Sequence, residues 1–535
     1  MDGPSSPRSD FGPSAPGELQ YHHIAISFLA AIAAFFLIEP IFKACLPIYL
    51  SYNEGWNASH ALRAMNGQNL YDIPNLLAVN NYPPLSFFIV GALGSLLGDN
   101  IFAGRMIALL AFFVTAANVS FIVFRICDGA PAAIFSGVFF VAIMAGIYDV
   151  YIGINDPQML GHALMTAGLA VLIGRETRTR NLVLSALFIC AGGFVKHNLV
   201  SLPIAVAAYL AVWHRRSFRV WIGCMAGFIA LGLATTLAAF GLDFIESLNN
   251  PRRFTLFRLG RKMLHEPTKL QVPIAAWLIY SISTFFEKYT LLIGIYVVVA
   301  AGTAVVFSGG DGVAINVFFD LVIGLSIAIG LTLHRANETL VDRVSRMARL
   351  RVMSIVSLAL CFGIVIQVPA KAYRMATILP QLYSIRMETA ADIEYLEGRD
   401  GPVFCESLSL CYWAEKDLEV DAFHARQSFL TGVLDEDVLL DKVRSGYFDA
   451  IQLGLWDSSR DDERISSALV TTVKRCYEIS RISANGAFFT PASHDCDRVA
   501  YPDSPPPGVG SDPRRHSRWR PSEERLSGRQ ADRSG

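Results

Sequence analysis

Apolar residues fall along this chain in twelve long stretches that are separated by shorter polar segments. Apolar runs of about 15–20 residues have the length of helices that cross a lipid bilayer. The twelve stretches are residues 24–46, 85–98, 105–124, 131–148, 158–174, 182–195, 199–213, 219–240, 273–286, 289–307, 313–333 and 352–369. This pattern predicts a mostly α-helical protein with many membrane-spanning helices.

The basic residues between these stretches indicate how the helices are oriented. Lysine and arginine collect in residues 175–180, 214–219 and 335–351, and basic loops are retained on the cytoplasmic side of a membrane. All three loops fall on that side if residues 85–98, a short run behind two prolines, insert only halfway. This arrangement predicts about 11 transmembrane helices, a cytoplasmic N-terminus and an extracytoplasmic C-terminus. In the alternative, residues 85–98 cross the membrane and one crossing is lost elsewhere.

The chain beyond the last apolar stretch has a different character. It mixes short strand-like and helix-like segments and carries more acidic than basic residues, which predicts a small soluble α/β domain. The predicted strands are Pro402–Cys405, Phe448–Leu453 and Gly486–Thr490, and the predicted helices are Leu439–Val443 and Asp462–Ile479. The predicted organisation is a disordered cytoplasmic tail (1–20), a transmembrane domain (21–370) with a first extracytoplasmic loop (47–84), an extracytoplasmic α/β domain (371–500) and a disordered tail (501–535).

The composition agrees with a membrane protein and argues against other classes. Hydrophobic residues make up 53% of the chain and charged residues 17%, and the mean hydropathy is +0.40. A formal net charge of −1 indicates no nucleic-acid partner. The nine cysteines form no Cys-x-x-Cys or zinc pattern, so no metal site is predicted. Cys405, Cys411, Cys476 and Cys496 lie in the predicted extracytoplasmic domain, where pairing as Cys405–Cys411 and Cys476–Cys496 is plausible.

Two acidic residues at predicted helix ends on the extracytoplasmic side are the catalytic candidates. Glu54 lies just past the first apolar stretch, and an acid kept at a membrane edge is usually functional. Asp156 lies in a second loop on the same side, and either carboxylate could serve as a general base for an acceptor hydroxyl. Each also has a structural explanation. Asn53 would cap a helix whose first turn holds Glu54, and Asn155-Asp156-Pro157 would be a turn that caps the next helix.

Other polar residues in the same loops are candidates for binding a substrate. Lys196 interrupts an apolar stretch, so it either extends to the membrane interface or faces a polar cavity, where it would pair with a phosphate. Asp311 belongs to a Gly-rich turn, which is either an anion-binding loop or a plain connection. The remaining candidates share a loop or a helix face with these groups and are Asn53, His60, Arg63, Tyr82, Asn155 and His197.

The loops that carry these candidates resemble the GT-C superfamily of polytopic glycosyltransferases. The nearest resemblance is to its bacterial branch, which is similar to protein O-mannosyltransferases and to the aminoarabinose transferases of lipid A. The resemblance rests on the first loop, from Asn53-Glu54-Gly55-Trp56 to Tyr82-Pro83-Pro84-Leu85, and on Asn155-Asp156-Pro157 ahead of an apolar helix. It rests also on the overall plan of a first extracytoplasmic loop, a polytopic core and an extracytoplasmic C-terminal domain.

The resemblance implies a reaction on the extracytoplasmic side of the membrane. Members of the family transfer a sugar from a polyprenyl-phosphate donor, typically with inversion, and use an acid in the first loop. That acid is commonly the Asp of an Asp-Glu pair, whereas this chain has Asn53-Glu54. Either Glu54 or Asp156 has then taken the role, or catalysis is altered or lost. No cofactor is indicated with certainty, and a divalent cation held jointly by Glu54 and Asp156 stays open.

The sequence therefore predicts an inverting glycosyltransferase of the inner (plasma) membrane that acts on an unidentified glycan, lipid or protein acceptor. One alternative is a non-catalytic protein that binds a lipid-linked glycan, which fits the presence of Asn53. The other is a transporter or flippase of lipid-linked sugars, although no internal repeat is visible and the acids lie at helix ends. Transfer of a labelled sugar separates the first function from the other two, and scrambling in liposomes separates those two.

Overall fold

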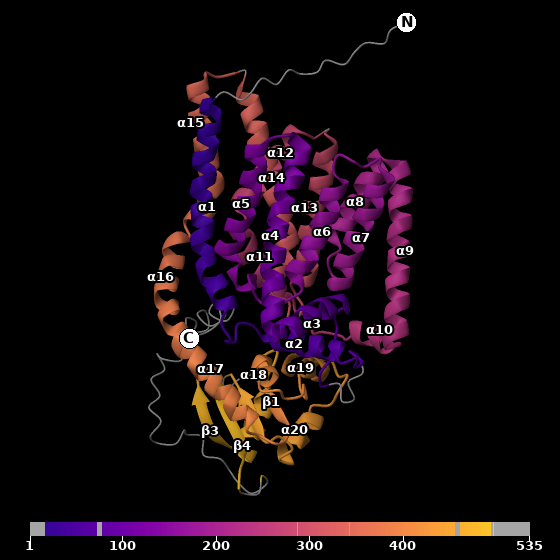
Figure 1. The fold of residues 1–535 in the computed structure, drawn as a ribbon, viewed down its shortest axis with the longest axis vertical. Helices are drawn as coiled ribbons and strands as arrows, with labels where there is room; N and C mark the ends of the chain where they lie inside the picture. Colours follow the sequence, from indigo (N-terminus) through magenta and orange to yellow (C-terminus); the bar gives the residue numbers. More distant parts are fainter. Residues whose placement is uncertain are drawn as a thin grey trace.

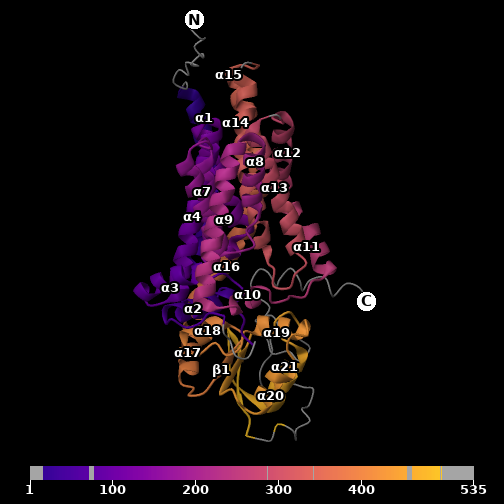
Figure 2. The same ribbon diagram turned by 90° about the vertical axis from the view of Figure 1, so that its right-hand side faces the viewer.

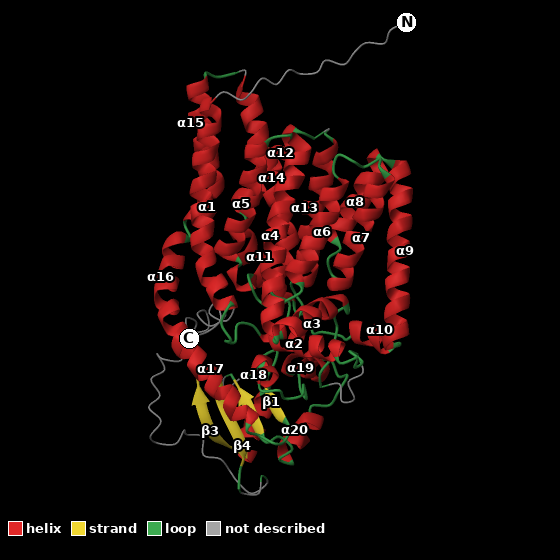
Figure 3. Cartoon of the chain, in the orientation of Figure 1, coloured by secondary structure: helices red, strands yellow, loops and turns green. Residues whose placement is uncertain are grey.

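The chain folds into a long helical bundle with a small mixed domain attached to one end (Figure 1). Helices dominate, and the strands are confined to the small domain (Figure 3). The predicted class, a mostly α-helical membrane protein with a small C-terminal α/β domain, is confirmed at this level. The computed structural model describes residues 16–71, 77–285, 287–341, 343–454, 461–493 and 496.

The bundle is built from apolar helices that run along its long axis. In the described chain they are α1 (Pro16–Ala44), α4 (Asn100–Cys127), α5 (Ala130–Ile147), α6 (Gln158–Leu172), α7 (Thr179–Val195), α8 (Ser201–Trp213), α9 (Arg215–Phe240), α12 (Gln271–Ser283), α13 (Lys288–Phe307), α14 (Phe319–Val341) and α15 (Arg346–Val365). Seven segments are long and apolar enough to cross a membrane, and five further apolar helices are shorter. The number of crossings, about 11 by the distribution of charge, therefore stays a prediction.

Helices α14 and α9 show where the core of the bundle lies. Every residue of α14 from Phe319 to Leu333 is buried, so this helix runs through the middle of the bundle. Helix α9 lies at the edge (Figure 1), and apolar side chains such as Leu231 are 62% exposed there. An apolar helix with an exposed outer face matches a position against lipid.

Short helices fill the junction between the bundle and the small domain. They are α2 (Tyr52–Met65), α3 (Leu85–Leu97), η1 (Asp149–Tyr151), α10 (Asp243–Leu248), α11 (Leu256–Lys269) and η2 (Ile315–Phe318). Helix α3 covers the run that was predicted to insert only halfway. It lies beside α2 at the junction rather than along the bundle (Figures 1 and 2), which fits that prediction without testing it.

The three basic loops lie at the end of the bundle that faces away from the small domain (Figure 1). Residues 175–180 run from the end of α6 into α7, and residues 214–219 run from the end of α8 into α9. Residues 335–341 are the end of α14, and residues 343–351 lead into α15. The helices that lead to these loops, α6, α8 and α14, each begin near the junction (Figure 1). The segregation of charge that was predicted from the sequence is therefore present along the long axis of the molecule.

The chain enters the small domain through α16 (Val368–Ile378), η3 (Leu379–Gln381) and α17 (Leu382–Glu397). The domain then contains β1 (Val403–Cys405), α18 (Leu408–Trp413), α19 (Ala422–Leu430), α20 (Asp437–Arg444), β2 (Ala450–Leu453), α21 (Ser467–Cys476), β3 (Tyr477–Ser483) and β4 (Gly486–Pro491). The strand order is β1-β2-β4-β3. Strands β1 and β2 are parallel, and β4 runs antiparallel to both β2 and β3.

One predicted helix of this domain is too long. The sequence predicted a helix over Asp462–Ile479, but α21 ends at Cys476 and β3 begins at the next residue. Pairing with β4 outweighs the local preference here, because Gly486 adopts a φ of 115° that closes a tight hairpin between the strands. Both cysteine pairings that were suggested from the sequence are formed, Cys405 with Cys411 and Cys476 with Cys496.

Candidate functional site

The first turn of α2 reaches three parts of the molecule. Successive residues of a helix are rotated by about 100° from one another, so Tyr52, Asn53 and Glu54 point in three directions. The Tyr52 hydroxyl donates to Asp421 of the small domain, and the Asn53 amide donates to Asp156 ahead of α6 at 3.2 Å. Glu54 turns into the bundle towards α4. The start of α2 is therefore the junction of the small domain, α6 and α4.

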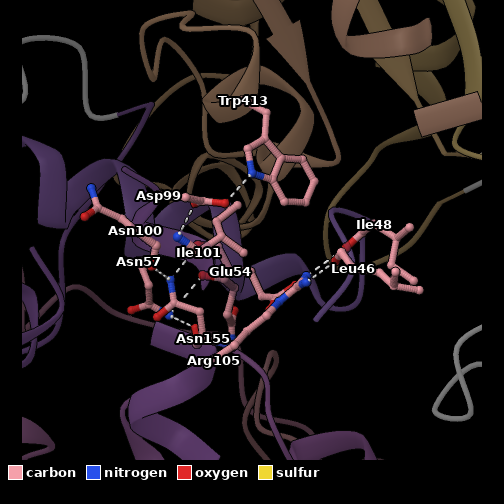
Figure 4. A network of polar contacts seen from close by, with 11 residues as sticks. Leu46, Ile48, Glu54, Asn57, Asp99, Asn100, Ile101, Arg105, Asn155 and Trp413 are labelled. Atoms are coloured by element: carbon pink, nitrogen blue, oxygen red, sulfur yellow. Dashed lines mark hydrogen bonds and ion pairs between the residues drawn. The ribbon is translucent and has the colours of Figure 1, made fainter. Parts of the chain in front are cut away.

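Glu54 forms a closed ion pair with Arg105 of α4 (Figure 4). Arg105 Nε lies 2.7 Å from Oε1 and Nη2 lies 2.7 Å from Oε2, which is the two-point geometry of the strongest charge-assisted hydrogen bonds. The guanidinium also donates to the carbonyls of Leu46 and Ile48, and the Asn155 N–H donates to Oε1 at 3.1 Å. Both Glu54 oxygens are occupied, and the side chain is 0% exposed.

Asparagine side chains fasten this ion pair to the start of α6 (Figure 4). The Asn155 amide donates to the Glu54 carbonyl at 3.2 Å and to the Asn100 carbonyl at 3.4 Å. The Asn57 amide donates to the carbonyls of Asn53 at 2.9 Å and Asn155 at 2.8 Å. Asn155, a predicted substrate-binding residue, therefore holds α2 against the loop that precedes α6.

Asp156 is the centre of a second, looser cluster. Its Oδ1 accepts from the Gln158 N–H at 2.8 Å, which caps α6, and from Lys196 Nζ at 3.3 Å. Its Oδ2 accepts from the Asn53 amide at 3.2 Å. Lys196 Nζ also lies 4.9 Å from the centre of the Tyr82 ring. Four predicted site residues, from loops far apart in the sequence, thus come together at the junction.

The charge of Lys196 persists although its side chain is buried. Burial disfavours the ammonium, but the neighbouring Asp156 and Tyr82 outweigh it and raise the pKa of Lys196 above its ordinary value. An ammonium has three donors, and the contacts with Asp156 and Tyr82 leave capacity for a further acceptor. The cluster therefore offers a fixed positive charge at the bundle end that faces the small domain.

An aromatic group lies beside this charge on α2. The Trp56 ring is 5.1 Å from Tyr82, 5.7 Å from Phe87 and 4.5 Å from His60 between ring centres. His60 is 0% exposed, and burial, assisted by Arg63, lowers the pKa of His60 to about 3. The imidazole is thus neutral. Among the described residues, neither of its ring nitrogens has a hydrogen-bond partner.

Asp311 lies in a different cluster from the other predicted site residues. Its carboxylate is 0% exposed and forms ion pairs with Arg253 Nε at 2.9 Å and with Arg258 Nε at 3.0 Å. Gln427 of α19 donates to it at 3.3 Å, and Arg258 also pairs with Glu463 of the small domain at 2.6 Å. The Gly312 N–H of the same turn donates to Glu463 Oε2 at 3.0 Å, so the turn fastens the bundle to the small domain.

Two further predicted residues lie at the margin of the site. His197 is next to Lys196 in the chain, but its side chain is exposed. Arg63 lies at the far end of α2, where it donates to the Asn69 carbonyl at 3.0 Å. Arg63 therefore lies about one turn beyond His60 on α2.

The residues that complete these clusters from elsewhere in the chain were not predicted from the sequence. Arg105 was counted into an apolar stretch, although a lone arginine in such a stretch is itself a signal of a buried partner. Asp421 and His424 of α19 carried no such signal, because 369 residues separate Asp421 from Tyr52. Only the packing of the small domain on α2 brings them to the junction.

The carboxylates at the junction do not suit a shared divalent cation. Both Glu54 oxygens face Arg105, and the Asp156 oxygens face Lys196, Gln158 and Asn53. Within the residues that the structure describes, no group of three His, Cys, Asp or Glu side chains could hold a metal ion. A cation bridging Glu54 and Asp156 would have to displace Arg105 and Lys196.

The architecture has counterparts among solved membrane transferases. The chain has the GT-C fold, as the resemblance implied. ArnT from Cupriavidus metallidurans, solved with bound undecaprenyl phosphate, matches with a TM-score of 0.58 and 12% sequence identity over 90% of this chain and 99% of ArnT. No protein-family model and no curated protein matches the sequence.

An archaeal enzyme shows the same fold. The oligosaccharyltransferase of Archaeoglobus fulgidus, solved with a tethered acceptor peptide, matches with a TM-score of 0.51 and 9% identity over 88% of this chain and 74% of that protein. Its complex with an inhibitory peptide and a dolichol-phosphate matches with a TM-score of 0.50 and 10% identity over 90% and 75% of the two chains. At these identities the likeness establishes the fold alone.

Proposed function

We propose that this chain is a membrane glycosyltransferase that moves a sugar from a polyprenyl-phosphate donor to an envelope acceptor. The proposal rests on one observation above all, which is the buried ammonium of Lys196. Its Nζ lies 3.3 Å from Asp156 Oδ1 and 4.9 Å from the centre of the Tyr82 ring. Negative charge develops on the phosphate as the sugar leaves, and a positioned cation stabilises it. The solved neighbours with bound undecaprenyl phosphate or dolichol-phosphate support a donor of this class.

The reaction belongs on the side of the membrane that holds the small domain. The basic loops between α6 and α7, after α8 and between α14 and α15 lie at the other end of the bundle (Figure 1). By the positive-inside rule that end and the N-terminus are cytoplasmic. The small domain is then extracytoplasmic in the inner (plasma) membrane, which agrees with its two disulfides. A single displacement at the sugar carbon inverts its configuration.

In the proposed enzyme, Glu54 has a structural role and is not the base. Its place in the sequence favoured Glu54 as the base, but its two oxygens are taken up by Arg105 at 2.7 Å each. A base must reach the acceptor hydroxyl, whereas Glu54 is 0% exposed and accepts three hydrogen bonds from the protein. We therefore assign to Glu54 the anchoring of α2, and to Lys196 and Asp156 the donor side of the reaction.

A cellular experiment tests the function even while the sugar is unidentified. Cells that lack this gene are complemented with wild type, Lys196→Met or Lys288→Met at matched membrane levels, and envelope glycans are compared by mass spectrometry. Lys288 is a matched control, since its Nζ also lies over a tyrosine ring, at 4.4 Å from the centre of Tyr289. We expect wild type and Lys288→Met to add a sugar to an envelope component and Lys196→Met to add none.

A non-catalytic protein that binds lipid-linked glycans is the second candidate. It is favoured by Asn53 and by the closed Glu54–Arg105 pair, which together leave α2 without a free carboxylate. If wild type changes no glycan while the purified chain binds undecaprenyl phosphate, this function replaces the transferase. If the purified chain instead scrambles the lipid in liposomes, the protein is a flippase.

A further inference from the structure

A buried Asp–His pair of the small domain faces α2 at the junction. Asp421 Oδ2 lies 2.5 Å from His424 Nδ1, and Asp421 Oδ1 accepts the Tyr52 hydroxyl. Asp421 is 0% and His424 is 6% exposed. The His424 ring stacks on Trp56 at 5.8 Å between ring centres, with 27° between the planes. The pair therefore touches the same α2 aromatic group that borders Lys196.

The hydrogen bonds fix which nitrogen of His424 is available. Burial opposes ionisation of Asp421, but His424 and Tyr52 hold the pKa of that carboxyl below its ordinary value. Burial, together with Asp421, raises the pKa of Tyr52 well above its ordinary value, so Tyr52 donates a proton rather than losing one. In the neutral form of His424, the ionised Asp421 selects the tautomer whose Nδ1 carries the proton, and Nε2 keeps its lone pair.

Buried polar atoms without partners collect around that lone pair. Within the described chain, His424 Nε2, Trp56 Nε1 and both His60 nitrogens have no hydrogen-bond partner, although the three rings contact one another in sequence. Buried donors and acceptors are nearly always satisfied. Hydroxyl groups of a bound sugar or acceptor are partners of the right chemistry, because they both donate and accept.

Three positions of the bundle side beside the aromatic group carry no unpaired carboxylate. Position 53 carries an amide instead of a carboxylate. Glu54 is held by Arg105 through both oxygens, and Asp156 is paired with Lys196. Transfer to a hydroxyl requires a proton acceptor, and α19 brings an imidazole to the aromatic group through the contact of His424 with Trp56.

The geometry points to His424 as the general base of the proposed transferase, with Asp421 and Tyr52 as its positioning residues. This inference rests on the proposed function. His424 Nε2 accepts the proton of the acceptor hydroxyl, and that oxygen forms the new bond to the anomeric carbon of the sugar. The bond from the anomeric carbon to the phosphate oxygen breaks, and its electron pair leaves with the polyprenyl phosphate beside Lys196. The imidazolium afterwards releases its proton to water.

A structural explanation covers only part of the arrangement. Asp421 also caps α19 by accepting from the N–H groups of Phe423 at 3.0 Å and His424 at 3.2 Å. A cap explains the carboxylate. It explains neither the contact of the imidazole with Trp56 nor the Tyr52 hydroxyl that reaches Asp421 across the junction.

The test compares conservative variants of the full chain in the complemented cells. We expect His424→Gln to lower the rate of sugar addition at least about 100-fold, the lower end of the range for loss of a general base. Asp421→Asn removes only a positioning residue, so we expect a smaller loss. His265→Gln, a change at an exposed histidine of α11, serves as the control and leaves the rate unchanged. Binding of undecaprenyl phosphate to the purified variants and their melting temperatures stay near wild type.

The outcomes separate this inference from the proposed function. If wild type adds a sugar and His424→Gln adds it at the same rate, His424 is not the base. If the variant loses lipid binding and thermal stability together with activity, its role is structural and the inference fails. If wild type itself adds no sugar, the proposed function fails first. If the His424→Gln protein does not accumulate, His424→Asn and the pH profile of the wild type show whether His424 is the base.

The pH profile requires no variant. It distinguishes a histidine base from a carboxylate base, because the free imidazole has a pKa of about 6.5 and free carboxylates have pKa values of about 4. The titratable groups that face His424 are Asp421 of its own helix and Tyr52 and His60 of α2, with Arg464 over the Tyr52 ring. His60 has a pKa of about 3, so its protonation does not change the rate near neutral pH. A rate that stays constant down to about pH 5 would assign the base to a carboxylate instead.

Discussion

Glu54 and Asp156 are two buried carboxylates at the same junction, each with a basic partner, yet they are held in different ways. Arg105 grips Glu54 at two points, 2.7 Å each, and its remaining donors go to backbone carbonyls. Lys196 meets Asp156 at a single point, 3.3 Å away. The planar fork of arginine makes a rigid anchor, whereas the ammonium of lysine is a point charge that can turn to another anion. Burial and charge alone do not distinguish an anchor from a binding site, but partner geometry does.

Breaking the Glu54 anchor has the largest expected effect. Arg105→Met leaves a buried carboxylate without its partner, which costs about 3–5 kcal/mol of folding free energy. We expect a strong loss of protein from the membrane and a lowered melting temperature in detergent. The double variant Glu54→Gln with Arg105→Met should recover part of the loss, because no unpaired charge remains. A Glu54→Gln protein that keeps its melting temperature and loses all transfer would instead identify Glu54 as the base.

Neutralising Asp156 should have a smaller effect, and it should raise the affinity for undecaprenyl phosphate. Asp156→Asn keeps a cap for α6 but frees Lys196 from its carboxylate. We expect undecaprenyl phosphate to bind about 10-fold more tightly, which corresponds to about 1.4 kcal/mol. Binding to the purified protein is measured by titration, with Asp128→Asn, at the far end of α4, as the control. Weaker binding in Asp156→Asn would show that Asp156 itself supports the donor.

Placing an acid at position 53, where the GT-C families that this loop resembles commonly have Asp, gives a sharper comparison. Asn53→Asp replaces the amide that donates to Asp156 at 3.2 Å with a like charge, which disfavours the anionic donor. We expect about fivefold weaker binding of undecaprenyl phosphate, about 1 kcal/mol, and no gain in the rate of transfer. A rate at least about 10-fold above wild type would show that a carboxylate at this position is the better base.

The smallest expected effect concerns stability at mildly acidic pH. His60 has a pKa of about 3 in the folded protein and about 6.5 when unfolded, so the unfolded chain binds more protons below pH 7. Folding stability should therefore fall as the pH falls, by somewhat less than about 1 kcal/mol between pH 7 and pH 6. Melting temperatures at these two values measure it, and His60→Leu should remove this part of the difference. An unchanged difference in that variant would place the pH sensitivity elsewhere.

The parts of the fold that follow from local pattern were predictable from the sequence. Apolar stretches such as 131–148 became helices with nearly the predicted bounds, as in α5 (Ala130–Ile147). The convergence of Asn53, Asp156, Lys196 and Tyr82 followed from placing their loops on one side of the membrane. The boundary between α21 and β3 was not predictable from local preference, because β4 supplies the hydrogen bonds of β3.

The roles of the site residues depended on contacts that no local pattern contains. The pairing of Glu54 with Arg105 was not visible in the sequence, because Arg105 lies 51 residues away in the chain and falls within an apolar run. The ion pairs of Asp311 were not visible either, because the arginines and the glutamine that surround it come from separate segments. His424 was not predicted at all. Its chemistry exists only where α19 packs on Trp56.

The start of α2 has a consequence for the order of biosynthesis. Tyr52 is made early, yet its partner Asp421 follows 369 residues later. At synthesis rates of about 5–20 residues per second the interval is on the order of tens of seconds. During most of that time the first loop is outside the ribosome, but Asp421, which binds Tyr52 at the start of α2, has not yet been made. A nascent chain that stalls before α19 would hold its membrane helices but no assembled junction, so it would remain without activity until translation is complete.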